Sequence, residues 1–395
     1  MENNSLPSNK PMHVLYVAHN SEVEKGGGAS ILLYNLMLDM KKRYNVIPYV
    51  LAPSAGELSN KCRENNIEIF ISEYCLWAMI EQKKTFVEIL KYYPRKVREY
   101  FRLQKIIESL QRKKFDLIHT NTSVIDIGAR IAQSLSIPHI WQLHEYGCDF
   151  LKPVSYVRQQ FNNTSAIITV SRAVCEYYSS VKKLCPIEKI RVIYGGVKVP
   201  EEYNKTHNGR VNFCMIGVIQ ENKNQLMAIN ACIKLKNFTD KFMLHIIGTG
   251  KEEYLSELKQ IINANGLDDN IKFWGFRRDI NTILQNMDVG LMLSRREAFP
   301  LVNIEYILNY MPVIGVNVGG IPELINNDCG FICELDDSEK LAELMHKFMI
   351  NPELLPQMGN NARERAASNF SLERNTDEIY KLYKEVLSAK KSLPQ

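Results

Sequence analysis

Short runs of β-branched and aliphatic residues recur along the chain and alternate with longer stretches that have helical spacing. This alternation is typical of βαβ units, in which parallel strands form one sheet and helices cover its faces. The predicted strands before residue 195 are HVLYVAH, NVIPYVL, IEIFIS, FDLIHT, PHIWQLH, SAIITVS and IRVIY. The first half of the chain is therefore predicted to form a doubly wound parallel sheet.

A second series of strands follows the polar stretch VPEEYNKTHNGR at 199–210, which has the composition of an interdomain linker. Its members are VNFCMIGV, FMLHIIGTG, NIKFWGF, MDVGLML, MPVIGVN and CGFICEL. We expect two Rossmann-like domains, one over 1–200 and one over 201–370. Because parallel sheets bind ligands at the carboxyl ends of their strands, two such halves facing each other would share a cleft.

One more helical pattern occupies 371–395. Ser371 is a suitable N-cap, and Ile379, Leu382 and Tyr383 repeat at helical spacing. This apolar stripe needs a partner, and we expect the helix to pack back on the N-terminal domain.

The composition is that of an ordinary globular protein, with 45% hydrophobic and 24% charged residues, and 395 residues suggest two or three domains. The initial MENNSLPSNK lacks the features of a secretory signal, and no apolar run approaches the ~18 residues of a membrane span. The nine cysteines include no C-x-x-C pair, which favours free thiols in a reducing compartment. We therefore expect a cytoplasmic protein.

The segment 83–114 changes that picture, because it holds eleven Lys or Arg against three Glu, a local charge of +8 in a chain whose net charge is +5. Apolar residues are interleaved with the basic ones, as in amphipathic helices that lie on anionic membranes. We expect such a helix, broken at Pro94, and peripheral contact with the inner face of the plasma membrane. A solvated helix face is the alternative interpretation.

The most informative stretch is SRREAFPLVNIEYILNYMPVIGVNVGGIPELI. Pro300 suits the start of a helix, so a helix is predicted to begin near Leu301, where the amides of Leu301 and Val302 are donors for phosphate oxygens. Glu305 is on the same face and can accept hydrogen bonds from both ribose hydroxyls. Glu297 lies before the helix, where it can contact a sugar or phosphate.

This segment resembles the E-x7-E region of the retaining GT-B glycosyltransferases of family 4, since EAFPLVNIE is followed by a short strand and VGGIPE. The resemblance implies a GT-B fold, with the acceptor bound by the domain over 1–200 and the nucleotide-sugar by the domain over 201–370. It also implies that Glu305 binds the ribose diol, while Glu297 and the backbone of Phe299, Leu301 and Val302 hold the donor sugar and diphosphate.

A second match, IGVIQENKNQ at 216–225, resembles the family's G-R-x-x-x-x-K-[GN] turn and makes Lys223 the lysine that contacts the diphosphate. An ordinary surface lysine at a helix start is the alternative. Val218 replaces an arginine that is frequent in the family and that helps to neutralise the diphosphate. Candidates for compensation are Lys251, Arg295 and Arg296.

In the first half, EKGGGAS at 24–30 is similar to the family's GGAE-type turn, which implies that Gly27 and Gly28 contact the donor. His144 in WQLHEYG matches a histidine that faces the donor sugar in the family. His119 in DLIHTNTS matches a turn that lines the acceptor side. A packing role is the alternative for either histidine.

Phe276 in WGFRRD matches a turn whose backbone meets the nucleotide base, although an aromatic residue there could also belong to the core. The sequence has no D-x-D motif, no H-E-x-x-H and no cluster of Cys and His, so we expect neither a metal ion nor another cofactor. Lys223 and helix-end amides would then stabilise the leaving nucleotide.

These observations predict a retaining glycosyltransferase with His144, Lys223 and Glu297 in catalytic roles. It would transfer a sugar from a UDP- or GDP-sugar to a glycan or lipid-linked acceptor in bacterial surface-polysaccharide synthesis, and it would not bind nucleic acid. Two alternatives remain at this stage. One is a non-catalytic glycosyltransferase-like subunit, which Val218 keeps open, and the other is a sugar-nucleotide epimerase of the same architecture.

Overall fold

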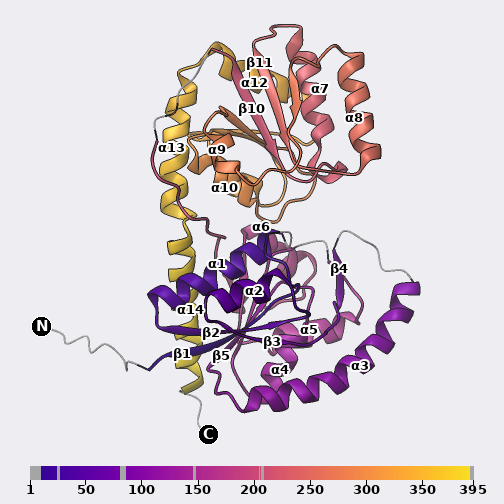
Figure 1. The fold of residues 1–395 in the computed structure, drawn as a ribbon, viewed down its shortest axis with the longest axis vertical. Coiled ribbons are helices and arrows are strands. Elements are labelled where there is room, and N and C mark those ends of the chain that lie inside the picture. Colours follow the sequence, from indigo (N-terminus) through magenta and orange to yellow (C-terminus); the bar gives the residue numbers. More distant parts are fainter. Residues whose placement is uncertain are drawn as a thin grey trace, which may run out of the picture. The chain divides into compact units, whose positions relative to one another are not determined.

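The computed structural model describes residues 10–24, 27–80, 86–145, 148–203, 205 and 209–391. By its contacts the chain divides into two units (Figure 1). The first comprises Met1–Ile193 and Asn375–Gln395, and the second is Tyr194–Arg374. The divisions thus lie after residues 193 and 374, where the sequence had suggested 200 and 370.

The first unit contains a parallel sheet with the strand order β3-β2-β1-β5-β6-β8-β9. The strands are β1 (Met12–Val17), β2 (Val46–Ala52), β3 (Glu68–Ile71), β5 (Leu117–Asn121), β6 (His139–Leu143), β8 (Ala166–Thr169) and β9 (Ile190–Val192). β5 and β6 are buried along their whole length, as expected for central strands covered on both faces. β4 (Ala78–Ile80) and β7 (Cys148–Phe150) form a separate antiparallel pair.

Helices connect these strands. They are α1 (Gly28–Arg43), α2 (Glu57–Glu64), α3 (Phe86–Gln111), α4 (Ile127–Leu135), α5 (Val154–Asn162), α6 (Arg172–Glu176), the π-helix η1 (Tyr177–Val181) and the 3₁₀-helix η2 (Ile187–Lys189). α3 continues through Pro94, so the predicted break there was wrong. Pro94 and Leu90, the residue one turn earlier, are both exposed, and water can therefore bond the carbonyl group that proline leaves without a donor.

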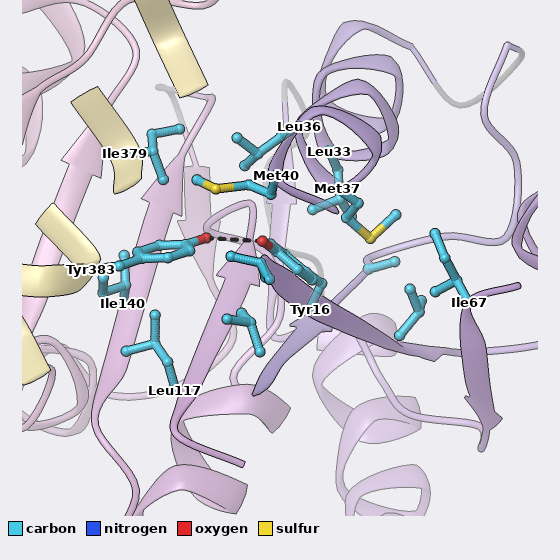
Figure 2. Packing of buried hydrophobic residues seen from close by; sticks show 14 of the residues in the cluster. Tyr16, Leu33, Leu36, Met37, Met40, Ile67, Leu117, Ile140, Ile379 and Tyr383 are labelled. Atoms are coloured by element: carbon cyan, nitrogen blue, oxygen red, sulfur yellow. Dashed lines mark hydrogen bonds between the residues drawn. The ribbon is translucent and has the colours of Figure 1, made fainter. Parts of the chain in front are cut away.

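The last helix, α14 (Leu372–Lys391), contributes to the core of the first unit. Figure 2 shows Ile379 and Tyr383 of this helix packed among residues of α1 and the sheet. The hydroxyl groups of Tyr383 and Tyr16 are 3.4 Å apart, and a guanidinium nitrogen of Arg43 is 2.5 Å from Asp377. From Asn375 onward the C-terminal segment therefore belongs to the first unit.

The second unit contains a six-stranded parallel sheet with the order β12-β11-β10-β13-β14-β15. The strands are β10 (Val211–Ile216), β11 (Phe242–Ile247), β12 (Ile271–Phe273), β13 (Val289–Met292), β14 (Val313–Val316) and β15 (Gly330–Cys333). The helices are η3 (Glu221–Lys223), α7 (Gln225–Lys236), α8 (Glu252–Ala264), α9 (Ile280–Leu284), α10 (Leu301–Leu308), α11 (Ile321–Leu324), α12 (Ser338–Ile350) and α13 (Leu354–Asn369). Two doubly wound parallel-sheet units, the fold class predicted from the sequence, are thus confirmed.

The loop after β10 and the loop after β11 are in close contact. Gly217 and Gly248 have φ angles of +148° and +144°, which side chains rarely tolerate. The amide of Gly217 donates to the carbonyl of Ile247 over 3.0 Å, and that of Ile219 donates to Thr249 over 2.8 Å. A Cβ on Gly248 would lie 1.9 Å from the carbonyl oxygen of Gly217. Glycine at 248 therefore allows the two loops beyond these strands to lie against each other.

Candidate functional site

In the second unit, α10 begins at Leu301 with Pro300 as its N-cap, as the sequence predicted. Amides in the first turn of a helix have no partner within the helix, so those of Leu301 and Val302 are suited to bind an anion. Glu305 follows one turn later and its side chain is mostly buried. Burial raises the pKa of its carboxyl group from 4.5 to about 7. When this carboxyl group is ionised, its oxygens are suited to accept hydrogen bonds from hydroxyl donors.

Lys223 and Glu297 meet at this site, although they come from different loops. The ammonium nitrogen of Lys223, at the end of η3, is 2.7 Å from Oε2 of Glu297, in the loop after β13. The backbones of the same loops are bonded too, since the amide of Arg295 donates to the carbonyl of Asn222 over 2.8 Å. The structure therefore brings together two of the three residues predicted to have catalytic roles.

The side chain of Phe299 is buried, so only its backbone is left for the predicted contact with the donor. The ring is 7% exposed and is stacked on Tyr194, with 5.4 Å between the ring centroids. The hydroxyl group of Tyr194 is in turn 3.0 Å from Glu323, at the start of α11. This packing fixes the loop that leads into α10, so that the amides there keep their orientation.

The structure distinguishes among the cations that might replace the arginine absent at Val218, whose side chain is exposed. Arg295 is held by Asp336 in a bidentate pair with distances of 2.6 and 2.7 Å. Lys251 follows Gly250, which forms a β-bridge with Ile219 next to Val218. Lys251 and Arg296 are both exposed, and both stay candidates.

Asp336 has no motif around it, and the sequence analysis missed it. Asp336 has a φ of +63° and accepts a bond from the side-chain amide of Asn224 over 3.1 Å. It therefore holds this loop in place in addition to pairing with Arg295. Phe276 lies in the turn after β12, at the far edge of the sheet from β13, and its ring is 63% exposed. Its exposure argues against the core-packing alternative and leaves the predicted base contact untested.

In the first unit, His144 follows the end of β6. Its Nε2 is 2.7 Å from Oδ1 of Asn121, and burial together with nearby His19 and His119 lowers its pKa to about 3. Glu145 accepts bonds from the amide and hydroxyl of Ser123 over 3.1 and 3.0 Å. His144 is therefore a neutral, oriented imidazole at the carboxyl edge of the sheet.

His119 does not fit the acceptor-side role that was predicted for it. Its side chain is fully buried, with Nδ1 2.5 Å from the hydroxyl of Tyr383 and Nε2 2.9 Å from Oε1 of Gln142. Desolvation lowers its pKa to about 4. A histidine with both nitrogens bonded inside the core holds α14 to the sheet and does not face a ligand.

The glycine-rich turn leads into α1. Gly27 has a φ of +80°, Gly28 is the first residue of the helix, and both are exposed. Lys25 and Gly26 of the same motif lie outside the described residues. The side-chain amide of Asn121 donates to the carbonyl of Ala29 over 3.0 Å and so ties this turn to His144. Asn121 was not predicted, because in the IHTNTS turn only His119 matches a residue of the family's pattern.

No group of three or more His, Cys, Asp or Glu in the described part of the chain has a geometry that would hold a metal ion. All nine cysteines are free thiols.

Comparisons with known proteins agree with this geometry. Residues 201–365 match the family described as Glycosyl transferases group 1, and residues 26–200 match Glycosyltransferase Family 4. Two parallel-sheet units with these two sequence matches define a glycosyltransferase of the GT-B fold. The chain belongs to family 4 of these enzymes, the group 1 glycosyltransferases.

Among the similar sequences is N-acetyl-alpha-D-glucosaminyl L-malate synthase from Bacillus anthracis, which is 24% identical over 72% of this chain and 78% of the relative. UDP-Gal:alpha-D-GlcNAc-diphosphoundecaprenol alpha-1,3-galactosyltransferase from Escherichia coli is 26% identical over 71% and 78%. The structure of Anabaena Alr3699/HepE in complex with UDP has a TM-score of 0.76 and 20% identity, covering 95% of this chain and all of that one.

Proposed function

We propose that this glycosyltransferase is a retaining enzyme that transfers a sugar from a UDP- or GDP-sugar to a hydroxyl group of a glycan or lipid-linked acceptor, without a metal ion. The observation that carries the proposal is the contact between Lys223 and Glu297 beside the N-terminus of α10. The cation and the helix-end amides suit the negative charge of a diphosphate, and the carboxylate suits the hydroxyl groups of a sugar.

In this proposal the diphosphate takes the place of Glu297 as the partner of Lys223. The amides of Leu301 and Val302 bind the remaining phosphate oxygens, so that charge on the leaving group is stabilised by donors already in place. Glu297, released from the lysine, accepts hydrogen bonds from sugar hydroxyls. Glu305 accepts those of the ribose.

The chemical step breaks the bond between the anomeric carbon and the diphosphate oxygen. A bond from the acceptor oxygen forms on the same face, so the configuration is retained, and the acceptor proton passes to the departing phosphate. No protein nucleophile takes part, and the protein contributes positioning and electrostatic stabilisation.

The relatives support the choice of donor and acceptor. The E. coli enzyme is named for a UDP-sugar donor and a diphosphoundecaprenol acceptor, and the Anabaena structure contains UDP. Capsular polysaccharide biosynthesis glycosyltransferase CapM of Staphylococcus aureus is 27% identical over 48% of this chain. We therefore favour UDP over GDP, and a lipid-linked acceptor in bacterial surface-polysaccharide synthesis.

The outer face of α3 supports a membrane contact. Tyr93, Val97, Tyr100 and Phe101 recur at helical spacing and are 49–67% exposed. Arg98 is exposed beside this stripe and Arg95 is exposed elsewhere on the helix, whereas Leu103, Ile106 and Leu110 face the core. An apolar stripe flanked by cations suits an anionic lipid surface. Within the described residues, no helix has the length and apolar character needed to cross a bilayer.

The predicted role of the whole segment 83–114 changes in two respects. Residues 83–85 lie outside the described part of the chain. Lys96 does not face outward, because its ammonium group is 2.6 Å from both Glu99 and Asp126 and its side chain is 11% exposed. The proposed membrane contact therefore rests on the residues from Tyr93 to Arg102, without Lys96. We propose a cytoplasmic enzyme held peripherally at the inner membrane face.

A nucleotide panel tests the donor proposal. Thermal unfolding is followed with UDP, GDP, ADP and their sugars, and a ligand at a hundred times its Kd should add about 2.7 kcal/mol of stability. UDP and one UDP-sugar should stabilise the wild type, and Glu305→Ala should lose most of this effect. Equal stabilisation of the variant would refute the ribose assignment. Nucleotide binding with neither transfer nor donor hydrolysis would favour the non-catalytic subunit.

Liposome flotation tests the membrane contact. Val97→Ser/Phe101→Ser and Arg95→Gln/Arg98→Gln should each reduce binding to vesicles that contain anionic lipid. The matched control is Phe238→Ser/Ile350→Ser, because these two residues are 70% and 63% exposed on other helices or turns of the molecule. Equal binding by all variants would remove the membrane proposal while leaving the donor proposal intact.

A further inference from the structure

Two histidines lie at the carboxyl edge of the first sheet, and the sequence predicts a role for only one of them, His144. His19 follows β1, His144 follows β6, and β5 runs between these strands. Both side chains are half-buried. Both lie beside the first turn of α1, because their neighbours Asn20 and Asn121 bond to Ser30 and Ala29 there. Each is bonded through Nε2 to an asparagine.

The amide of Asn20 fixes the tautomer of His19. Oδ1 of Asn20 accepts bonds from the backbone amide of Glu22 over 3.1 Å and from the hydroxyl of Ser30 over 3.2 Å, so the amide cannot be flipped. Its Nδ2, 2.9 Å from Nε2 of His19, must therefore be the donor. Nε2 accepts, and in the neutral ring the proton is on Nδ1.

The amide of Asn121 fixes the opposite tautomer in His144. Nδ2 of Asn121 donates to the carbonyl of Ala29 over 3.0 Å, so Oδ1 is the atom that faces Nε2 of His144 at 2.7 Å. Oδ1 can only accept, and Nε2 of His144 must carry the proton. Nδ1 of His144 then presents a lone pair.

The structure leaves the donor of His19 without a partner. Nδ1 of His19 is buried and makes no hydrogen bond to any residue that the structure describes. A buried donor without an acceptor is costly and calls for an explanation. A ligand atom that accepts this proton would provide one.

We propose that His19 and His144 form a donor–acceptor pair that binds one neutral hydroxyl group of a sugar. Nδ1–H of His19 donates to the hydroxyl oxygen, and Nδ1 of His144 accepts the hydroxyl proton. A hydroxyl group satisfies both histidines because it accepts and donates at once, whereas a phosphate or carboxylate oxygen would face the lone pair of His144. Asn20 and Asn121 are positioning residues, because they act through the histidines.

The ionisable groups around the pair keep it neutral. Desolvation lowers the pKa of His19 to about 4 and that of His144 to about 3, with His119 adding to the latter effect. The carboxyl group of Glu145, next in the chain, accepts from Ser123 instead, and burial raises its pKa. Both tautomers therefore persist through the neutral pH range.

This inference rests on the proposed function, since the hydroxyl would belong either to the acceptor glycan or to the donor sugar. The first experiment needs no activity. Nitrogen-15 imidazole NMR of the full chain, assigned with His19→Phe and His144→Phe, should show the proton on Nδ1 in His19 and on Nε2 in His144. The same tautomer in both rings, or the reverse pair, would overturn the proposal.

Two aspartate variants form a matched pair. Asn20→Asp places a carboxylate oxygen against Nε2 of His19 and should move that proton from Nδ1 to Nε2 or charge the ring. Asn121→Asp still accepts from Nε2 of His144 and should leave the tautomer there unchanged. A shift in both histidines, or in neither, would contradict the assignment of the two amides.

The last arm identifies the source of the hydroxyl. Methyl α-glycosides of glucose, galactose and N-acetylglucosamine, UDP alone, and the three corresponding UDP-sugars are each added to the wild type. Shifts of both Nδ1 resonances with a methyl glycoside indicate an acceptor hydroxyl, and shifts with a UDP-sugar but not with UDP indicate the donor. UDP binding without a joint shift for any sugar would reject the pair and leave the donor proposal standing.

With the sugar nucleotide that gives the joint shift, loss of one hydrogen bond should lower kcat/KM about 3- to 10-fold. His19→Phe and Asn20→Asp should both show this loss, whereas His19→Asn, whose amide nitrogen can take the place of Nδ1–H, should recover part of it. The Kd for UDP should stay at the wild-type value in all three variants. Full activity of His19→Phe would refute the pair.

Discussion

The ammonium group of Lys223 is 2.7 Å from a carboxylate oxygen of Glu297, and the side chains of the two residues are 25% and 16% exposed. Each residue thus holds the other in place at the mouth of the site before any ligand binds. In the proposed function, a diphosphate takes the place of Glu297 as the partner of Lys223. The two residues should therefore affect nucleotide binding in opposite directions.

Replacement of Lys223 by Met should weaken UDP binding by roughly 10- to 100-fold, because a hydrogen bond to a charged group contributes about 1.5–3 kcal/mol. Glu297→Gln should bind UDP at least as tightly as the wild type, because Lys223 then gives up no ion pair when the nucleotide binds. The same variant should transfer sugar more slowly. Titration calorimetry and transfer rates measure the two effects. Lys234→Met is the control, because Lys234, on α7, pairs with Glu339 outside the site. A loss of UDP affinity in Glu297→Gln would contradict the displacement.

Glu305 should make the protein less stable as the pH rises. Its pKa of about 7 in the folded state exceeds the ordinary 4.5. The unfolded chain therefore releases this proton first, and stability falls between these two values and then levels off. Glu305→Gln removes this loss of stability, which is on the order of 3 kcal/mol at pH values above the pKa of the folded state. The variant should be more stable than the wild type at about pH 8 and equal to it at about pH 4.

Chemical denaturation at the two pH values measures that difference. Glu257→Gln, a substitution of an exposed glutamate in α8, should give the same change in stability at both. An equal effect of Glu305→Gln at both pH values would show that the carboxyl group is not buried in the folded protein.

The same carboxyl group should make UDP binding depend on pH. Ribose hydroxyls donate hydrogen bonds, and a carboxylate accepts them more strongly than the neutral acid or an amide does. The ratio of UDP affinities, wild type to Glu305→Gln, should therefore rise as the pH passes through about 7, where Glu305 ionises. Taking the ratio removes the titration of the phosphate itself. A ratio that stays constant would show that Glu305 does not bind the ribose hydroxyls.

Much of the fold could be predicted from the sequence, because strands buried on both faces leave uninterrupted apolar runs. The helix start at Leu301 could also be predicted, because Pro300 and the apolar spacing act locally. Pro94 misled the prediction because the effect of a proline depends on whether the carbonyl one turn earlier reaches water. That is a property of the packed structure and not of the helix alone.

The parts that sequence analysis missed are pairings between distant segments. Asn121 orients His144 across two strands, and Asp336 holds Arg295 from a loop after β15. Neither asparagine nor aspartate has a local pattern that marks such a partner. His119 is the opposite case, in which a distant partner removes a predicted role. A histidine at a strand end suggests a functional residue, but the buried hydroxyl of Tyr383 bonds to it.

Lys96 is the residue for which sequence and structure give the most different expectations. Its ammonium group lies between Glu99, which is 2% exposed, and Asp126, which is fully buried. Lys96→Met would leave Asp126 without this cation and should destabilise the first unit by roughly 3–5 kcal/mol. Arg95→Met and Arg98→Met, at exposed neighbouring positions, should change stability by no more than about 0.5 kcal/mol. Thermal unfolding of the three variants is the test, and equal melting temperatures would show that Lys96 is a surface charge after all.

Gly248→Ala should disturb the second unit for two separable reasons. Its φ of +144° strains any side chain, and the added Cβ would lie 1.9 Å from the carbonyl oxygen of Gly217. Gly209→Ala tests backbone strain without a steric clash, because the φ of Gly209 is +80° and a Cβ added there would have no atom within 4 Å. Gly209→Ala should therefore cost about 1 kcal/mol. Gly248→Ala should cost at least about 2 kcal/mol more, since its backbone contact cannot relax without moving the loop.

The loop that has to move runs from Gly217 to Lys223, so the stability loss should be accompanied by weaker UDP binding in Gly248→Ala but not in Gly209→Ala. The methylene groups of Lys223 already lie 3.7 Å from the Cβ position of Gly217, which couples the glycine crossing to the ammonium group that we propose to bind phosphate. Calorimetry with UDP, at a temperature where both variants are folded, measures this coupling. Unchanged UDP affinity in a destabilised Gly248→Ala would mean that the crossing supports the fold without positioning Lys223.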